Sequence, residues 1–511
     1  MNQLFIETEQ IQDPREGKLQ VISNIDACNK ISEIMEDTLG PFGLDKLFAD
    51  DMTITNDGST IMKKLKISHP VGHILVKISE SQDNEIGDGT TSVVILTCSI
   101  LNSLKQVIKE NIEIELIYDT LLKLKKLCLK KLESLVVKTE GDLFYDLVET
   151  SVNSKNIREN KKLFAQIIVD TFNHADYEDL NTVGIKKIVG GSISDSVLAK
   201  GIAFEKCFTY AGYEQSPKKI IDPKIICLNV ELEWKAERDN AEIKIGDVEE
   251  YKKVIDAEWS IIRNKLDDCI ESGANIVLSS LPIGDYATQY FAKKNIFCAG
   301  RVSKTDLKRI TEAFGGSILS STEYITQECL SNCSLFEERQ LGKDRYNYFE
   351  GNNTNACTIL LRGPADNVLD EIERSVNDAI QVLKTAKRNK KVVTGGGSVE
   401  MALSNYIREI CKDFEGKALF VARSVAQAFE KIPTVLARNF GNDPLLTIGK
   451  LRKMHVGGKI NTGVSTKGVS DMVQDKIFEP FALKYNLINT SFDTAMEILM
   501  IDSTIINERP Q

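Results

Sequence analysis

Apolar side chains recur every three or four residues towards both ends of the chain, and this spacing predicts helices there. In the first part, helices are predicted over residues 19–38, 59–65, 70–82, from Val93 to beyond Val107, 112–135 and 141–175, the last broken by the polar residues 153–156. Ser59 is expected to cap the second of these helices. From Leu369 to about residue 452 the pattern is helical again, and a final helix and an apolar strand, Ile498–Ile501, are expected to end the chain.

The middle of the chain, from about Gly184, is richer in β-branched residues and alternates with a period of two. Strands are predicted at Ile225–Glu233, Asn275–Ser279, Ser317–Leu319 and Thr358–Arg362, between helices over 247–271, 285–294 and 306–314. This alternation predicts an α/β unit of about 150 residues. The outline fits one helical domain made from both ends, with the α/β unit inserted between them.

Composition narrows the class of protein. A chain of 511 residues is too long for one ordinary core, and about three domains are expected. Hydrophobic residues make up 42% and charged residues 27%, which is typical of a globular protein. The formal net charge of -10 disfavours binding to nucleic acid, which needs a concentrated basic surface. This net charge does not exclude a local site for a single nucleotide.

Cysteine and histidine give no metal signature. The eleven cysteines include no CxxC pair, so reduced and mostly buried thiols are expected. His69 and His73 are four residues apart but lack a third ligand nearby, so we interpret them as structural. The N-terminal stretch is acidic and polar, unlike a signal peptide, and no run approaches the 18 to 20 apolar residues of a membrane span, so the protein is expected to be soluble and cytoplasmic.

One short stretch, Gly87-Asp88-Gly89-Thr90-Thr91-Ser92, stands between a polar run and the apolar helix that starts near Val93. Glycines let a backbone approach a ligand closely, and amides at a helix start favour phosphate. Asp88 adds the hard carboxylate oxygen that Mg²⁺ prefers. A plain glycine-bearing loop that caps a helix is the alternative, because short glycine-rich matches are common. The chain has no Walker A pattern, Rossmann fingerprint or kinase signature set.

Four motifs in order resemble those of one family, the group II chaperonins, across essentially the whole chain. They are Leu39–Gly43, Thr55–Thr60, Gly87–Ser92 and Thr394–Ser398. Within the family, the middle segment resembles one particular subunit type of the eukaryotic cytosolic chaperonin. The stretches that carry this second resemblance are 229–233, 235–237, 239–243, 256–259, 281–292 and 297–302.

The resemblance implies a multi-domain α+β and α/β chaperonin fold. A mainly helical equatorial ATP domain would comprise 1–141 and 395–511, a small intermediate domain 142–208 and 363–394, and an α/β apical substrate-binding domain 209–362. The helix near 247–271, with the loop before it, is similar to the helical lid protrusion. The resemblance further implies two stacked rings of eight subunits, seven related paralogous partners, ATP or ADP with Mg²⁺, and enclosure of unfolded clients, among them cytoskeletal proteins such as actin and tubulin.

The resemblance also implies roles for individual residues. Asp57 and Asp378 are expected to be catalytic, with Asp378 activating the attacking water and reaching the nucleotide only when the intermediate domain closes. Asp88 is the expected Mg²⁺ ligand. The expected nucleotide-binding residues are Gly40, Pro41, Gly89, Thr90, Thr91, Ser92, Ser154, Lys155, Gly396, Gly397, Glu479 and Lys484. Tyr286, Gln289 and Tyr290, on one apical helix, are the expected client-contacting residues.

Without the resemblance, several of these residues have plainer interpretations. Asp57 sits in an Asn-Asp-Gly turn, and Asp378 falls away from the apolar stripe of its helix, as a solvated surface residue would. The chain also departs from the family pattern, since Phe440 stands where a small residue is usual and Asn111–Glu115 replaces a Gly-x-His-Pro break. A ring subunit that binds nucleotide but hydrolyses little is the alternative function. A monomeric small-molecule kinase is disfavoured because no kinase motif is present.

Overall fold

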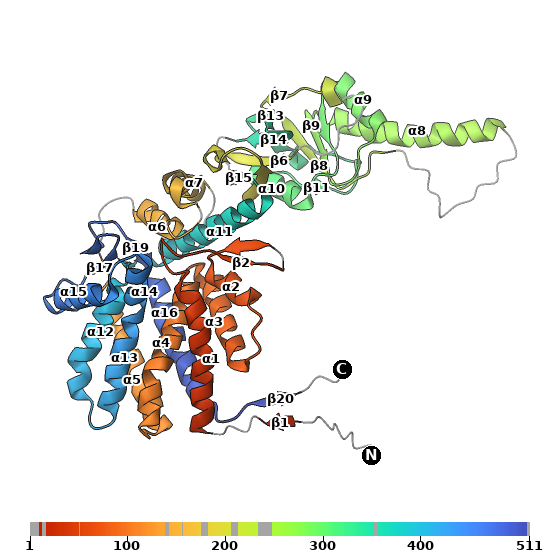
Figure 1. Ribbon diagram of the computed structural model, residues 1–511. Coiled ribbons are helices and arrows are strands. Elements are labelled where there is room, and N and C mark those ends of the chain that lie inside the picture. The colour runs from red at the N-terminus through yellow and green to blue at the C-terminus, as the bar shows by residue number, and fades with distance from the viewer. Residues whose placement is uncertain are drawn as a thin grey trace, which may run out of the picture. The chain divides into compact units, whose positions relative to one another are not determined.

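The computed structural model describes residues 10–12, 17–50, 52–137, 143–155, 157–174, 182–205, 213–233, 248–351 and 356–507. The chain forms two compact units (Figure 1). Unit 1 combines Met1–Ile168 with Arg374–Gln511, and unit 2 is Val169–Glu373. The insertion of the middle between two helical ends therefore agrees with the sequence pattern. The finer division into equatorial, intermediate and apical parts, with the bounds given above, stays a prediction.

Unit 1 is mainly helical. Its helices are α1 (Lys18–Glu36), α2 (Gly58–Lys64), α3 (Pro70–Ile86), α4 (Thr90–Lys109), α5 (Ile114–Glu133), α6 (Leu143–Val152), the 3₁₀ turn η1 (Arg158–Asn160), α12 (Ser398–Ile410), η6 (Cys411–Asp413), α13 (Ala418–Phe429), α14 (Lys431–Asn439), α15 (Pro444–Val456) and α16 (Phe481–Leu499). Two more helices, α7 (Lys161–His174) and α11 (Asp366–Asn389), run across the boundary between the units.

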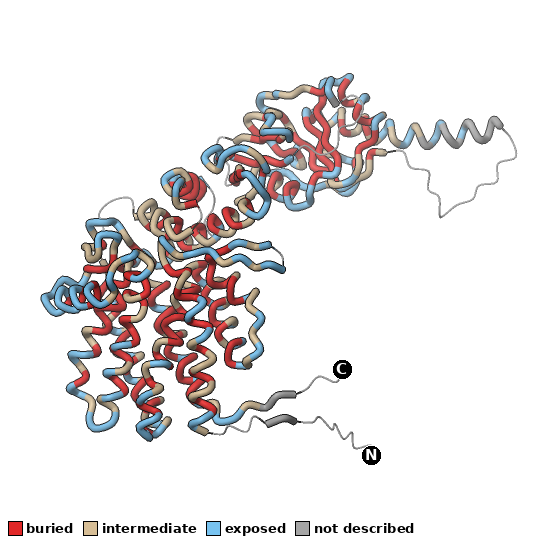
Figure 2. The backbone as a smooth tube through the Cα atoms, in the orientation of Figure 1, coloured by how far each residue is buried: buried red, intermediate tan, exposed pale blue. Residues whose placement is uncertain are grey.

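Helix α4 forms the centre of the unit 1 core. It packs against α1, α13, α16 and α3, and most of its apolar residues are buried. Figure 2 colours the backbone by the burial of each residue. By length and composition alone α4 is long and apolar enough to cross a membrane, so the expectation that no segment approaches such a span is wrong. Because 61% of its most apolar window is buried among neighbouring helices, α4 is accounted for as the core helix of a globular unit.

Short antiparallel strand pairs complete unit 1. They are β1 (Gln10–Gln12) with β20 (Ile505–Asn507), β2 (Lys46–Phe48) with β3 (Thr53–Thr55), β16 (Val392–Thr394) with β19 (Phe478–Pro480), and β17 (Thr462–Ser465) with β18 (Gly468–Asp471). The predicted strand Ile498–Ile501 is wrong. Ile498 and Leu499 are fully buried in the last turn of α16, and their apolar run continues a helical stripe.

Unit 2 is built on sheets. The strands are β4 (Val183–Val189), β5 (Val197–Ala199), β6 (Gly201–Glu205), β7 (Lys219–Ile221), β8 (Lys224–Leu228), β9 (Ile276–Ser279), β10 (Phe297–Ala299), β11 (Ile318–Leu319), β12 (Ser331–Asn332), β13 (Leu335–Leu341), β14 (Asp344–Glu350) and β15 (Cys357–Gly363). The helices are α8 (Val248–Glu271), α9 (Asp285–Lys293) and α10 (Lys304–Phe314), with 3₁₀ turns η3 (Ile193–Asp195), η4 (Tyr213–Gln215) and η5 (Gln327–Cys329).

The sheet order confirms an α/β arrangement. One sheet runs β10-β9-β8-β11 with parallel neighbours, and β12 pairs with β8. The others run β6-β14-β13-β7 and β4-β15-β5. The strand predicted over Ile225–Glu233 ends earlier, at Leu228, because the chain leaves the sheet there and Leu232 makes only an isolated bridge to Ile283. The loop expected before the lid helix, 234–247, lies outside the described residues.

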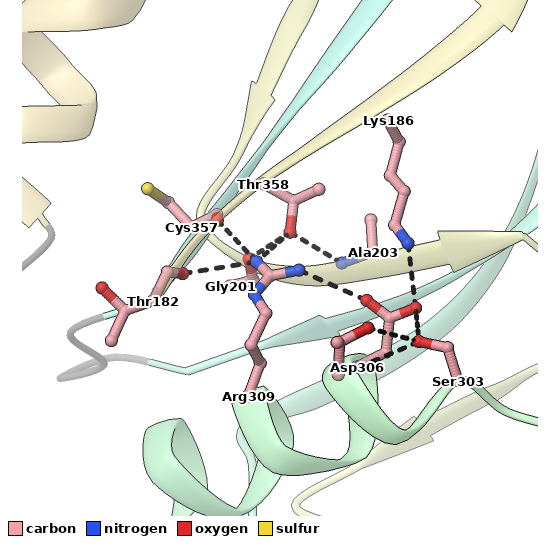
Figure 3. A network of polar contacts seen from close by, with 10 residues as sticks. Thr182, Lys186, Gly201, Ala203, Ser303, Asp306, Arg309, Cys357 and Thr358 are labelled. Carbon is pink, nitrogen blue, oxygen red and sulfur yellow. Dashed lines mark hydrogen bonds and ion pairs between the residues drawn. The ribbon is translucent and has the colours of Figure 1, made fainter. Parts of the chain in front are cut away.

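A buried arginine connects α10 with the β4-β15-β5 sheet of unit 2 (Figure 3). Arg309 of α10 donates from Nη2 to the carbonyl oxygens of Cys357 (2.8 Å) and Thr182 (3.3 Å) and to the Thr358 hydroxyl (3.0 Å). A Cβ at Gly184 of β4 would lie 2.1 Å from Arg309 Nη1, so only glycine leaves room for the guanidinium. The change of sequence character at Gly184 thus coincides with a close packing contact.

Candidate functional site

A cavity of about 70 Å³ lies in unit 1 where four segments meet. It has room for one small polyatomic group, on the order of two water volumes. Its lining includes most of the residues singled out from the sequence motifs. The lining residues are Thr38, Leu39, Gly40, Asn56, Asp57, Gly58, Asp88, Gly89, Thr90, Thr91, Ser92, Ser154 and Lys155.

The loop Gly87–Gly89 joins α3 to α4 through two glycines with left-handed backbones, at φ 79° and 77°. Gly89 is the N-cap of α4, and no side chain caps the helix there. The first amides of α4 therefore lack a side-chain partner, which is the arrangement that receives an anion. The Gly89 amide donates to Asp88 Oδ1 at 2.7 Å, which orients the carboxylate.

Gly87 also brings α11 to the loop. A Cβ at Gly87 would lie 2.6 Å from Gln381 Cβ and 3.2 Å from the carbonyl oxygen of Asp378. Glycine is required here both by its backbone angle and by this close approach. The close packing places α11, and with it Asp378, beside the cavity.

Asp57 caps α2. Its Oδ2 accepts from the Thr60 amide at 2.9 Å and from the Thr60 hydroxyl at 2.7 Å, and the Thr90 hydroxyl donates to Oδ1 at 3.3 Å. The expectation that Ser59 caps this helix is therefore wrong. The carboxylate stands one residue before the first helical residue, from which it reaches the amide three residues on.

Lys155 and Asp378 form the central ion pair of the site. Lys155 Nζ lies 2.8 Å from Asp378 Oδ2 and 3.9 Å from Asp57 Oδ1. The Asn56 side-chain amide donates to the Ser154 carbonyl oxygen at 2.9 Å and holds this loop against the Asn56–Gly58 turn. Asp378 is thus not a solvated surface residue, and its arrival on domain closure stays a prediction. Its side chain is 15% exposed and already pairs with a lysine that lines the cavity.

Burial sets the protonation of this pair. It raises the pKa of Asp378, the charge of Lys155 opposes the shift, Asp57 adds to it, and the result is about 7. Burial would lower the pKa of Lys155, but Asp378, Asp57 and Asp88 together raise it well above its usual range. Lys155 is therefore always cationic, and Asp378 has the pKa of a group that exchanges protons near neutral pH.

The other two aspartates differ from each other. Burial alone would raise the pKa of Asp57, but Lys155 and hydrogen bonds from Thr60 and Ser59 outweigh it and lower that pKa. For Asp88, burial outweighs Lys155, the Gly89 amide and Lys484, and its pKa is raised. Asp57 is thus held as an anion, whereas the positive charge around Asp88 is too small to offset the effect of burial on its pKa.

This charge imbalance fits a divalent cation. Asp57, Asp88 and Asp378 lie around Lys155, with Lys484 as the other cation that acts on Asp88, and charge held away from water needs a counter-charge. In the described part of the chain, no group of three or more potential metal-binding side chains converges. A Mg²⁺ here would be held by Asp88 together with phosphate oxygens and waters, which is its usual coordination.

Most of the other residues expected to bind nucleotide lie in the segments around Gly397 and Lys484. Gly397, at φ 75°, is the N-cap of α12, again without a side-chain cap. Lys484 Nζ lies 2.7 Å from both Glu479 Oε2 and Glu400 Oε1. The cavity lining does not include Pro41, Gly396, Gly397, Glu479 or Lys484. Sequence reasoning missed Glu400, although an acid in the first turn after a glycine-rich helix start was its signal.

The two tyrosines expected to touch clients lie against α8. Tyr286 accepts from Arg263 Nε at 3.0 Å, and its ring centroid is 4.9 Å from that of Trp259. Tyr290 donates to Asp267 at 2.7 Å. Gln289, on the same helix, is exposed. These contacts give both tyrosines a packing role, and client contact by the three residues stays a prediction.

The chain belongs to the TCP-1/cpn60 chaperonin family, whose model matches residues 31–509. Among the curated proteins, it is 58% identical to T-complex protein 1 subunit eta of Encephalitozoon cuniculi over the full length of both chains. It is 42% identical to the eta subunits of Arabidopsis thaliana, over 98% of this chain and 93% of the relative, and of Homo sapiens, over 97% and 94%. The family resemblance of the four motifs is confirmed. Eta is also the subunit type that the middle segment resembles.

Proposed function

We propose that this chain is an ATP-driven subunit of a hetero-oligomeric chaperonin double ring, built with seven paralogous partners in the cytoplasm. ATP hydrolysis at the unit 1 site would be coupled to the enclosure and folding of client proteins, with actin and tubulin among them by family resemblance. The observation that carries the proposal is the convergence of Asp378, Lys155 and Asp57 beside the uncapped start of α4.

Each residue has a physical role in this proposal. The free amides at Thr90–Ser92 bind phosphate oxygens, and Lys155 adds a fixed positive charge where negative charge develops. Mg²⁺, when bound, neutralises phosphate charge and orients the oxygens. Asp378 accepts the proton of the attacking water, for which its pKa of about 7 suits it. Asp57 stays anionic and holds the Thr60 and Thr90 hydroxyls in place.

The test uses assembled complexes in which only this subunit is altered. Asp378→Asn should leave ATP bound at full stoichiometry and remove the hydrolysis contributed by this subunit, on the order of 100-fold at its own site. We call that contribution the Asp378-dependent hydrolysis. Asp88→Ala should weaken Mg²⁺-dependent ATP binding instead.

Unchanged turnover in Asp378→Asn would favour the alternative of a ring subunit that binds nucleotide but hydrolyses little. Full Mg²⁺-dependent binding in Asp88→Ala would refute the metal role of Asp88. Loss of binding in Asp378→Asn would contradict a role confined to the chemical step.

A further inference from the structure

The turn Leu39–Gly43 supplies one edge of the cavity and is held firmly on one side by α14. A Cβ at Gly40, whose φ is 85°, would lie 2.6 Å from Leu436 Cδ2. The Asn439 side-chain amide donates to the carbonyl oxygens of Glu36 at 2.9 Å and Leu39 at 2.8 Å. These contacts anchor the turn to the helical core of unit 1.

On its other side the same turn is held by Arg158. The guanidinium carbon lies 4.0 Å from the centre of the Phe42 ring, and Nη1 donates to the Pro41 carbonyl oxygen at 2.9 Å. Phe440 meets Phe42 edge to face, with centroids 5.4 Å apart at 71°. Arg158, Phe42 and Phe440 therefore form one stack, in which a planar cation covers an aromatic ring. We call it the Arg158 stack.

Arg158 also belongs to the loop that carries Lys155. The Arg158 amide donates to the Lys155 carbonyl oxygen at 3.0 Å, and the Lys155 amide donates to the Val152 carbonyl oxygen at 3.1 Å. Backbone hydrogen bonds thus connect the end of α6 with Lys155, and Lys155 with Arg158. Among the described residues, no carboxylate forms an ion pair with Arg158, so its charge serves the stack and the Pro41 carbonyl.

We propose that Arg158 is a positioning residue that links the Lys155 loop to the Gly40 turn, and so fixes the Lys155 ammonium relative to the opposite edge of the cavity. This inference rests on the proposed ATPase function and adds to it a residue that none of the four family motifs contains. It also gives Phe440, the large side chain where a small one is usual, a function as the second support of Phe42.

The main test compares Arg158→Lys, which keeps the charge but loses the plane, with Arg423→Lys at an exposed position of α13. In assembled complexes, Arg158→Lys should lower the kcat of the Asp378-dependent hydrolysis about tenfold, because small displacements of catalytic groups are costly, and leave the Kd for ATP within about twofold. The acid limb of the pH–rate profile of Arg158→Lys should move to higher pH, because a displaced Lys155 stabilises the Asp378 anion less. Arg423→Lys should change none of these values.

A double-mutant cycle keeps the proposal testable. Phe42→Leu removes the ring. The double variant with Arg158→Lys should lose no more kcat than the more severe of the two single variants. Phe42→Tyr keeps the ring and should retain activity. Normal kcat and an unmoved acid limb in Arg158→Lys, or losses that multiply in the double variant, would overturn the inference. If Asp378→Asn itself fails to reduce hydrolysis, the proposed function fails instead, so the two failures are distinguishable.

Discussion

Three aspartates share one lysine in the candidate site, and their surroundings give them different chemistry. Asp57 caps a helix and is held as an anion by Thr60 and Lys155. Asp88 is oriented by one backbone amide in a loop of two glycines. Asp378 is buried next to Lys155, with a pKa of about 7. These surroundings suit the three aspartates to the different roles proposed for them, which are anchor, metal ligand and base.

The pKa of Asp378 predicts the pH dependence of hydrolysis. A base works as the anion, so the Asp378-dependent hydrolysis should be present above about pH 7 and be lost as the pH falls through that value. Lys155 favours the anion, whereas Asp57 and Asp83 disfavour it. Lys155→Gln should therefore move the acid limb to higher pH, and Lys155→Arg should leave it in place. A pH–rate profile of each assembled complex measures this, and a limb that stays in place in Lys155→Gln would contradict the account.

The Arg309 network of unit 2 predicts a stability effect (Figure 3). Arg309→Lys cannot reach Cys357, Thr182 and Thr358 together, and the buried carbonyls left without a donor should cost about 3 kcal/mol. Lys186→Ala, which removes a partly exposed partner of Asp306 at 2.9 Å, is the matched control and should cost under about 1 kcal/mol. Hydrogen exchange of the β15 amides measures the loss of stability in each of the two variants. Equal protection in the two variants would refute the role assigned to Arg309.

At the scale of single residues, local pattern was a poor guide to Asp378. Its place on the helical wheel, away from the apolar stripe, predicts solvent, because periodicity describes only one packing partner. The structure gives α11 a second partner, the Gly87 loop, which no local pattern in α11 encodes. Family resemblance is what singles out Asp378, and both its catalytic role and its arrival on closure stay predictions.

The helices that start at Gly89 and Gly397 lack the side-chain caps that several other helices have. α2, α10 and α15 begin at Asp57, Ser303 and Asp443, whose side chains accept from backbone amides. α4 and α12 begin at Gly89 and Gly397 without side-chain caps. A helix start without a cap leaves amides for an anion, so the glycines exchange some local stability for a binding site.

The contact between Gly87 and α11 predicts that Gly87→Ala lowers hydrolysis. The added Cβ would meet Gln381 at 2.6 Å and push α11 away, and kcat should fall at least about tenfold. Gly458→Ala is the matched control, because its φ of 83° is as strained but nothing lies within 4 Å of its added Cβ. It should cost about 1–2 kcal/mol of stability and leave hydrolysis unchanged. Equal kcat values in the two complexes would contradict the coupling.

Most helices could be predicted from their periodicity, whereas many strands, among them β13 and β14, were not predicted. Ser59 is the cap expected from the sequence, whereas the side chain of Asp57, with an extended backbone at φ -70° and ψ 126°, caps α2. Ile498–Ile501 is apolar enough for a strand, but its burial continues the stripe of α16. Short apolar runs are ambiguous because burial, and not backbone preference, sets their composition.

For the whole molecule, the sequence order already contains the architecture. Helical ends enclose an α/β middle, and the chain forms two units with the same division. The pattern of residues in one chain does not show how that chain assembles with other chains. Unit 1 leaves large apolar side chains exposed on α15, with Leu445 at 87% and Val456 at 73%, and an exposed apolar patch often marks an interaction site. Such exposure fits a subunit that buries this surface against other chains.

The central claim is that unit 1 binds nucleotide at the start of α4 and hydrolyses it with Asp378. Its most direct test is a structure of the assembled complex prepared with Mg²⁺, ADP and aluminium fluoride, which imitates the phosphoryl group in transfer. We predict fluoride density against the amides of Thr90–Ser92 and Lys155, a metal at Asp88, and a water within hydrogen-bonding distance of Asp378. Nucleotide bound elsewhere in this chain, or no nucleotide here while other subunits are loaded, would contradict the account.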